Sequence, residues 1–423
     1  MTVLLGAIAD DFTGATDLAN TLVKAGMRTI LLTGTPEVNY DPGDTDAVVV
    51  ALKSRTAPVK EAVDNSLLVL EWLLKIGVQQ VFFKYCSTFD STAKGNIGPV
   101  ADALRNRLGD DIPIVCPAFP AAGRTIYKGN LFVGDVLLAE SSMKDHPLTP
   151  MRDSSLVRLM SAQCAGDVGL VTNEVVSRGS ESIKIRYSEL LQCGMNYAVV
   201  DAIDDSDLIA IGESVAEHKL VTGGSGVAMG LPENYRRQGM LGNPVAAGYP
   251  DARGRSVVLS GSCSEATRKQ IAFVNERWPS FKIDIDDIAA EHDVAGQAVQ
   301  WYAEQTSDLP VLIYASEDPE EVVKNQNRYG RLKSGEMIEN VFARIAKLLR
   351  DNEMRTLVVA GGETSGAVVS ALELHSLRIC AEIDPGVPWT ETLEEDCMAI
   401  ALKSGNFGGE DFFVKAVNLL GSL

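Results

Sequence analysis

Short apolar runs alternate with amphipathic stretches along the whole chain, and this alternation restricts the fold more than any other feature of the sequence. Each run has the character of a β-strand and ends in a polar or glycine-rich loop. Alternation of this kind is typical of mainly parallel sheets that are flanked by helices. We therefore expect an α/β protein. In the first half of the chain the strand-like runs lie at residues 3–9, 47–52, 80–84, 112–116, 168–172, 197–201 and 220–222.

The pattern is interrupted once, by a stretch of weak periodicity that is rich in Gly, Pro, Ala and Arg. A length of 423 residues suits two or three domains. We expect an N-terminal domain of residues 1–234, a linker of residues 235–255 and a C-terminal domain of residues 256–423, with a ligand cleft between the two domains. The second series of strand-like runs begins near residues 256, 282, 311, 356 and 399.

Charge and hydropathy restrict the partners of the chain. The formal net charge of −19 opposes binding to nucleic acid or to an anionic membrane surface. No apolar run approaches the ~20 residues that a membrane-spanning helix needs. The first residues lead directly into a strand without a basic region or a cleavage site, so we expect a cytoplasmic protein. Its partners should be small molecules, and a homodimer is an open alternative to a monomer.

The first strand-like run leads directly into Asp10 and Asp11, which are followed by Thr13 and Gly14 at the start of a helix. The amide groups at such a strand-to-helix turn face the carboxyl edge of the sheet and favour an anionic ligand. Asp11 is placed where a substrate hydroxyl could lose a proton. In the alternative interpretation, the two acids only cap the helix.

A second polar cluster follows the strand at residues 80–84, and cations lie at the equivalent ends of other strands. Such groups suit a small polyhydroxylated acid, because cations bind its carboxylate and polar side chains bind its hydroxyls. Asp90 is a second candidate for the catalytic base. The expected substrate-binding residues are Asp10, Arg55, Lys84, Ser87, Thr88 and Arg124. The alternative is that the hydroxyl-rich loop only caps the helix that begins near Ile97.

Three loops of the second domain, at residues 260–264, 360–366 and 403–409, are rich in Gly and Ser. Glycine lets backbone amides approach phosphate oxygens closely, and hydroxyls add further donors. The chain has neither the P-loop pattern nor the Gly-x-Gly-x-x-Gly dinucleotide pattern. These loops therefore predict a nucleotide site of another type.

The strings at residues 8–17, 83–100, 259–264, 359–366 and 402–408 closely resemble those of the four-carbon acid sugar kinases. This resemblance implies an N-terminal acid-sugar domain, a C-terminal ATP domain and transfer of the γ-phosphoryl group to the 4-hydroxyl of 3-oxo-tetronate. Threonate and erythronate stay open as alternative substrates, since relatives that act on them share the same plan. The nucleotide contacts of the family correspond to Ser260, Gly361, Gly362, Glu363, Thr364 and Gly405.

Within this hypothesis Asp11 orients or deprotonates the 4-hydroxyl, while Arg55, Lys84 and Arg124 hold the acid. Mg²⁺ is expected to bridge the phosphates of ATP. Two other classes of function compete with a kinase. A nicotinamide-dependent oxidoreductase predicts the missing dinucleotide pattern. A non-catalytic solute-binding protein has no need of glycine-rich nucleotide loops.

Overall fold

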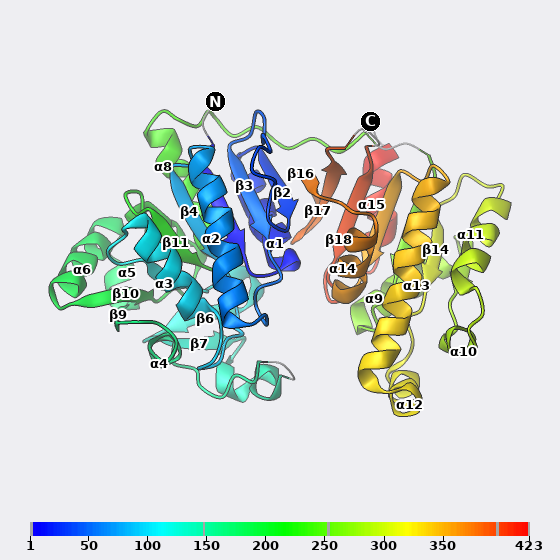
Figure 1. Ribbon diagram of the computed structural model, residues 1–423, viewed down its shortest axis with the longest axis horizontal. Helices are drawn as coiled ribbons and strands as arrows, with labels where there is room; N and C mark the ends of the chain where they lie inside the picture. The colour runs from blue at the N-terminus through cyan, green and yellow to red at the C-terminus, as the bar shows by residue number, and fades with distance from the viewer. Residues whose placement is uncertain (1–2, 147–148, 252–253, 395–396, 422–423) are drawn as a thin grey trace. The chain divides into compact units, whose positions relative to one another are not determined.

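The structure is a computed structural model that describes residues 3–146, 149–251, 254–394 and 397–421. The chain forms two compact units that divide between Ala246 and Ala247 (Figure 1). The residues expected to form a linker begin inside helix α8 (Leu231–Arg237). Tyr235 of this helix is buried and donates a hydrogen bond from its hydroxyl to Gln80 Oε1 at 3.0 Å, which fixes α8 to unit 1.

Unit 1 is built on an eight-stranded sheet with the order β2-β3-β1-β4-β11-β5-β10-β9, and every pair of neighbours is parallel. Its central strands are buried along their whole length, as expected for a sheet that is covered on both faces. The strands are β1 (Leu5–Ala9), β2 (Thr29–Thr33), β3 (Ala47–Ala51), β4 (Gln80–Lys84), β5 (Ile114–Cys116), β9 (Asp167–Val171), β10 (Met195–Val200) and β11 (Leu220–Gly223).

Amphipathic helices cover this sheet. Helix α2, for example, buries Val69, Leu70, Trp72 and Leu73 and packs beside α3, as Figure 1 shows. Besides α8, the helices of unit 1 are α1 (Phe12–Lys24), α2 (Val59–Lys75), α3 (Ile97–Leu108), α4 (Leu156–Ser161), α5 (Asn173–Val176), α6 (Ser180–Gln192) and α7 (Asp205–Ser214). Four short 3₁₀ segments, η1 (Pro120–Ala122), η2 (Leu138–Glu140), η3 (Ser142–Asp145) and η4 (Ser225–Gly230), complete the set.

A small antiparallel sheet of three strands was not expected from the sequence. It consists of β6 (Arg124–Tyr127), β7 (Asn130–Val133) and β8 (Val136–Leu137), joined in that order by tight turns. Its first turn contains Lys128 and Gly129, both at positive φ. The backbone amides of these two residues donate to the buried carboxylate of Asp201 at 2.7 and 2.8 Å, which holds the hairpin against unit 1.

Unit 2 contains a second sheet in which β13-β14-β12-β15-β18 are parallel and β17 and β16 extend it with antiparallel pairs. The fold class is thus confirmed as α/β, with a mainly parallel sheet in each unit. The strands are β12 (Ser256–Ser260), β13 (Ser280–Lys282), β14 (Val311–Tyr314), β15 (Thr356–Ala360), β16 (Ser376–Asp384), β17 (Val387–Thr392) and β18 (Ala399–Lys403). The helices are α9 (Glu265–Asn275), α10 (Ile285–Ala289), α11 (Val294–Glu304), α12 (Pro319–Tyr329), α13 (Arg331–Asp351), α14 (Gly362–Ala371) and α15 (Phe412–Gly421).

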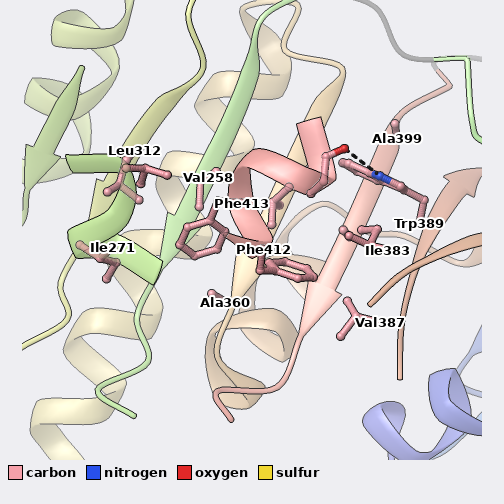
Figure 2. Close-up of a cluster of buried hydrophobic side chains, with 14 of the residues drawn as sticks. Val258, Ile271, Leu312, Ala360, Ile383, Val387, Trp389, Ala399, Phe412 and Phe413 are labelled. Atoms are coloured by element: carbon pink, nitrogen blue, oxygen red, sulfur yellow. Dashed lines mark hydrogen bonds between the residues drawn. The ribbon is translucent and has the colours of Figure 1, made fainter. Parts of the chain in front are cut away.

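The core of unit 2 holds the last strand and the last helix together (Figure 2). Phe412 and Phe413 of α15 are fully buried against the sheet, and Trp389 Nε1 donates to the carbonyl of Ala416 at 3.2 Å. Burial of each large side chain contributes about 1.5–3 kcal/mol. This packing anchors both ends of the glycine-rich segment between β18 and α15. None of the described helices combines the length and the apolar character that crossing a membrane requires.

Candidate functional site

The carboxyl ends of β3, β1 and β4 are adjacent in unit 1, and the residues that follow these strands form a charged cluster. Asp10, directly after β1, is 5% exposed and receives two hydrogen bonds from Arg55. Nε of Arg55 donates to Oδ2 at 2.9 Å, and Nη2 donates to Oδ1 at 2.8 Å. This bidentate geometry is the strong form of an Arg–carboxylate pair.

Arg55 contacts two further carboxylates. Its Nη2 lies 2.9 Å from Oδ1 of Asp11, and its Nη1 lies 3.9 Å from Oδ2 of Asp90. Burial favours the neutral form of the guanidinium, but Asp10 and Asp11 outweigh this effect and raise the pKa of Arg55 above its ordinary value. Burial also raises the pKa of Asp10, which the charge of Arg55 opposes. One half-buried cation therefore faces three acids at a single edge of the sheet.

Asp11 caps the first helix, which is one of the two roles that the sequence left as alternatives. As the N-cap residue of α1, it accepts a hydrogen bond from the amide of Gly14 at Oδ1, over 2.9 Å. Its other oxygen, Oδ2, has no contact within hydrogen-bond distance among the described residues. The side chain of Asp11 is 32% exposed, against 10% for that of Asp90. Asp11 is therefore the carboxylate that a ligand can reach most readily.

Gly14 makes this arrangement possible, because a Cβ atom at this position would lie 2.5 Å from Asp11 Oδ1 and 2.9 Å from Lys84 Nζ. We expect Gly14→Ala to displace both side chains and to lower kcat/KM by about 10-fold or more, since misplacement of about an ångström is costly to catalysis. Steady-state kinetics would test this, with thermal unfolding measured in parallel. Gly34→Ala serves as the control: Gly34 also lies in unit 1 and has open space around it, although its positive φ costs some stability. Wild-type kinetics for Gly14→Ala would contradict the prediction.

Asp90 lies in a constrained loop. Phe89 and Asp90 have φ values of +65° and +43°, which residues other than glycine rarely adopt. Thr88 Oγ1 donates to Asp90 Oδ1 at 2.7 Å, and Cys86 Sγ lies 3.0 Å from the same hydroxyl. Burial raises the pKa of Cys86 to about 11, so this thiol stays neutral at ordinary pH. Two consecutive residues in this backbone region are typical of functional sites.

The remaining expected residues of unit 1 are placed differently. Lys84 is 3% exposed and donates from Nζ to the carbonyl of Tyr85 at 2.9 Å. Ser87 is half-buried, and its hydroxyl makes no hydrogen bond among the described residues. Arg124 begins β6 of the small antiparallel sheet and donates from Nη1 to the carbonyl of Ala122. In the described parts of the chain no contact joins Arg124 to the cluster around Arg55.

Asn96 is a residue of this site that the sequence analysis missed. Its Nδ2 donates to the carbonyls of Ser54 at 2.7 Å and Ala57 at 2.9 Å. The amides of Ser54 and Arg55 in turn donate to the carbonyl of Asp10, at 3.0 and 3.2 Å. Asn96 thereby fixes the loop that carries Arg55. An Asn directly before a helix predicts an N-cap, yet its side chain caps nothing here, so sequence alone offered no signal for this role.

The expected nucleotide residues of unit 2 also meet at one sheet edge, where β12, β15 and β18 end side by side. Ser260 is fully buried, and its hydroxyl lies 3.2 Å from that of Ser316. Gly361 N donates to the carbonyl of Lys403 at 2.8 Å, and Ser264 Oγ donates to the carbonyl of Gly405 at 2.6 Å. These bonds tie the three glycine-rich loops together.

Two glycines of these loops leave no room for a side chain. Gly361 has a φ of +130°, and a Cβ atom there would lie 2.9 Å from Thr364 Oγ1. A Cβ atom on Gly405 would collide with Ser262 Oγ. Gly362, in contrast, faces open space at the first turn of α14, whose N-cap residue offers no side-chain hydrogen bond. Glu363 is exposed and Thr364 is buried. The free amides of this turn are suited to an anion.

Comparison with known protein families matches both units. Residues 5–231 match a sugar-binding N-terminal domain, and residues 257–413 match a nucleotide-binding C-terminal domain. Together the two family models span most of the chain.

Curated relatives match over nearly the whole length. The 3-oxo-tetronate kinase of Pseudomonas fluorescens is 51% identical over 419 residues, which cover 99% of this chain and 97% of the relative. The 3-oxo-tetronate kinase of Burkholderia multivorans is 52% identical over 99% of this chain and 97% of its own length. That of Haemophilus influenzae is 46% identical, with 97% and 98% covered.

Two solved structures are similar across the chain. Protein HI1011 of Haemophilus influenzae is 45% identical with a TM-score of 0.86, and the match covers 98% of this chain and 100% of that one. A protein of Salmonella typhimurium LT2, provisionally described as a tRNA synthase, is 44% identical with a TM-score of 0.91. That match covers 97% of this chain and 98% of the other.

Proposed function

Since the chain belongs to the four-carbon acid sugar kinase family, we propose that it transfers the γ-phosphoryl group of ATP to the 4-hydroxyl of 3-oxo-tetronate. The products are 3-oxo-tetronate 4-phosphate and ADP. The observation that carries this proposal is the match at about half identity to 3-oxo-tetronate kinases over 99% of the chain. The tRNA-synthase description of the Salmonella protein would require a basic RNA-binding face, which a formal charge of −19 disfavours.

In unit 1, Asp11 acts on the attacking hydroxyl. No described residue is hydrogen-bonded to its Oδ2, and the side chain is partly exposed, so this oxygen can accept the hydrogen bond of the 4-hydroxyl and then its proton as the bond to phosphorus forms. Arg55 Nη2 and the amide of Gly14 both stabilise Oδ1, which keeps the carboxylate oriented. Asp90 is the second candidate for this role, but its side chain is more buried and Oδ1 already accepts from Thr88.

The carboxylate of the sugar acid binds to the cations of unit 1. Arg55 has used Nε and Nη2 for Asp10 and Asp11, so Nη1 is the part of the guanidinium that is left for a ligand. Lys84 has used one of its three N–H groups and keeps two. Ser87 and Thr88 supply hydroxyls to the sugar acid. Arg124 is proposed to bind the acid as well, and its position after β5 is the only basis for this assignment.

In unit 2, the phosphates of ATP bind to the glycine-rich loops and to the first turn of α14, with Ser260, Gly361, Gly362, Glu363, Thr364 and Gly405 as the nucleotide-binding residues. Phosphoryl transfer needs mainly positioning and neutralisation of charge, and backbone amides supply both. Mg²⁺ enters as part of the MgATP substrate, held by phosphate oxygens and water. In the described parts of the chain, no group of three or more His, Cys, Asp or Glu side chains is arranged to hold a metal ion.

A coupled assay of ADP release tests the proposal directly. MgATP is supplied with 3-oxo-tetronate, D-threonate or D-erythronate, and a reaction without acid measures background hydrolysis. We expect strong preference for the 3-oxo acid. Equal or faster turnover of threonate or erythronate would assign a sister activity, and absence of ADP release with every acid would contradict a kinase. In a separate mixture without ATP and coupling enzymes, oxidation or reduction of a nicotinamide cofactor with the same acids would favour an oxidoreductase instead.

A further inference from the structure

The segment at residues 404–409, which joins β18 to α15, directs its carbonyl groups toward two fully buried side chains. Lys403 Nζ donates to the carbonyls of Ser404, Gly405 and Phe407 at 3.2, 3.1 and 3.2 Å. Gln270 Nε2, on α9, donates to the carbonyls of Phe407, Gly408 and Gly409 at 3.0, 3.0 and 2.9 Å. Five of the six carbonyls of residues 404–409 thus accept hydrogen bonds on the inner side of this loop.

Peptide geometry then fixes the direction of the amides. In a trans peptide the N–H group points opposite to the preceding carbonyl, and no described peptide bond is cis. The N–H groups of Gly405, Asn406 and Gly408 therefore point away from Lys403 and Gln270. Among the described residues these three amides make no hydrogen bond, whereas the next one, Gly409 N, donates to Asp384 Oδ2 at 3.0 Å. The loop presents three free donors on its outer side, where Asn406 is exposed and the two glycines are half-buried.

Lys403 adds a positive charge directly behind these amides. Its side chain is fully buried, and no carboxylate of the described residues pairs with it. Its Nζ also donates to Thr267 Oγ1 at 2.9 Å, so all three N–H groups are in use. Burial lowers the pKa of Lys403 to about 8. A buried cation without a counter-ion is costly, and an anion bound at the loop would compensate it.

We propose that residues 404–409 form a phosphate-binding nest, in which the amides of Gly405, Asn406 and Gly408 donate to phosphate oxygens of ATP and are held in place by Lys403 and Gln270. Successive free amides on one side of a loop are a known form of anion site. The two side chains are positioning residues, since their donors face the protein and not the ligand. This inference rests on the proposed function of unit 2 in binding ATP, and it extends the resemblance, which assigns only Gly405 in this loop.

Lys403→Met and Gln270→Met test the positioning role, because methionine retains length but donates nothing. We expect KM for ATP to rise by about 10-fold or more, the scale of lost charge-assisted hydrogen bonds. KM for the sugar acid should stay within about 2-fold, because that acid binds in unit 1. Lys403→Arg should recover part of the loss. Lys347→Met is the matched control, since this lysine of α13 is exposed and its side chain makes no hydrogen bond or ion pair among the described residues.

Hydrogen exchange on the wild-type protein tests the amides themselves and does not depend on the folding of a variant. A peptide covering residues 404–409 should become protected when a non-hydrolysable ATP analogue is added. An unprotected loop in a protein that binds the analogue would overturn the nest, as would an unchanged KM for ATP in both methionine variants. If the wild-type protein neither binds the analogue nor releases ADP, the proposed kinase function fails instead.

Discussion

Replacement of Asp11 by asparagine is expected to lower turnover by about a hundredfold or more, the scale of general-base assistance. Asparagine keeps the size of the side chain and can still accept the hydrogen bond from Gly14, so α1 should remain capped. It cannot take up the proton of the attacking hydroxyl. Affinity for ATP, which binds in unit 2, should therefore stay near the wild-type value. Steady-state kinetics and nucleotide titration measure the two quantities separately.

Asp204→Asn is the matched control for this variant. Asp204 is the N-cap residue of α7 in the same unit, where its Oδ1 accepts from Asp207 N at 2.9 Å, and within the described ranges no hydrogen bond or ion pair links it to Arg55. We expect wild-type turnover for this control. If Asp11→Asn keeps most of its turnover, the role passes to Asp90, which Asp90→Asn would then reveal. If Asp11→Asn loses thermal stability together with its activity, Asp11 is assigned to capping alone.

Arg55→Met is expected to lower the free energy of unfolding more than any other substitution considered. It removes the cation that faces Asp10, Asp11 and Asp90, and it leaves the buried carboxylate of Asp10 without its ion-pair partner. Loss of one member of a buried ion pair destabilises a protein by about 3–5 kcal/mol. Equilibrium unfolding in urea measures this loss of stability. Arg107→Met is the control, because Arg107 makes a similar bidentate contact with Glu71 on an exposed surface and should change stability little.

The stability deficit of Arg55→Met should also depend on pH. Burial already raises the pKa of Asp10, and without Arg55 only the weaker effect of Lys84 opposes this rise. A folded-state pKa above the unfolded value means that the folded protein binds more protons, so stability falls as pH rises through this range. We therefore expect a smaller deficit relative to the wild type at pH 5 than at pH 8. A deficit that is equal at both values would show that Asp10 does not carry the effect.

Much of the fold could be predicted from the sequence, because apolar periodicity reports directly which residues are buried. The strand at residues 80–84 and the helix start at Ile97 lie where they were expected. The strand expected to begin near residue 282 was partly wrong, since β13 ends at Lys282 and Ile285 begins α10. The antiparallel sheet β6-β7-β8 was missed, because its short strands carry too few apolar residues to produce a pattern.

The candidate site was harder to predict, because periodicity does not report which strands are neighbours. Arg55 follows β3 and Lys84 is the last residue of β4, and these two strands flank β1, so both side chains reach the same place as Asp11. Arg124 follows β5, which β11 separates from β4 in the sheet. The positioning roles proposed for Lys403 and Gln270 could not be predicted either. The role of a polar residue in a strand or helix becomes clear only when the loop that it contacts is known.

In the proposed mechanism the two oxygens of Asp11 have different tasks, so catalysis depends on whether the first turn of α1 is formed. Oδ1 holds the first turn of α1 through Gly14, while Oδ2 is the oxygen that we propose for the substrate. Each time the first turn opens, the carboxylate loses its fixed direction, although the rest of unit 1 stays folded. Local opening of this kind needs far less free energy than global unfolding. Heating should therefore remove competent molecules from the population well before it melts the protein.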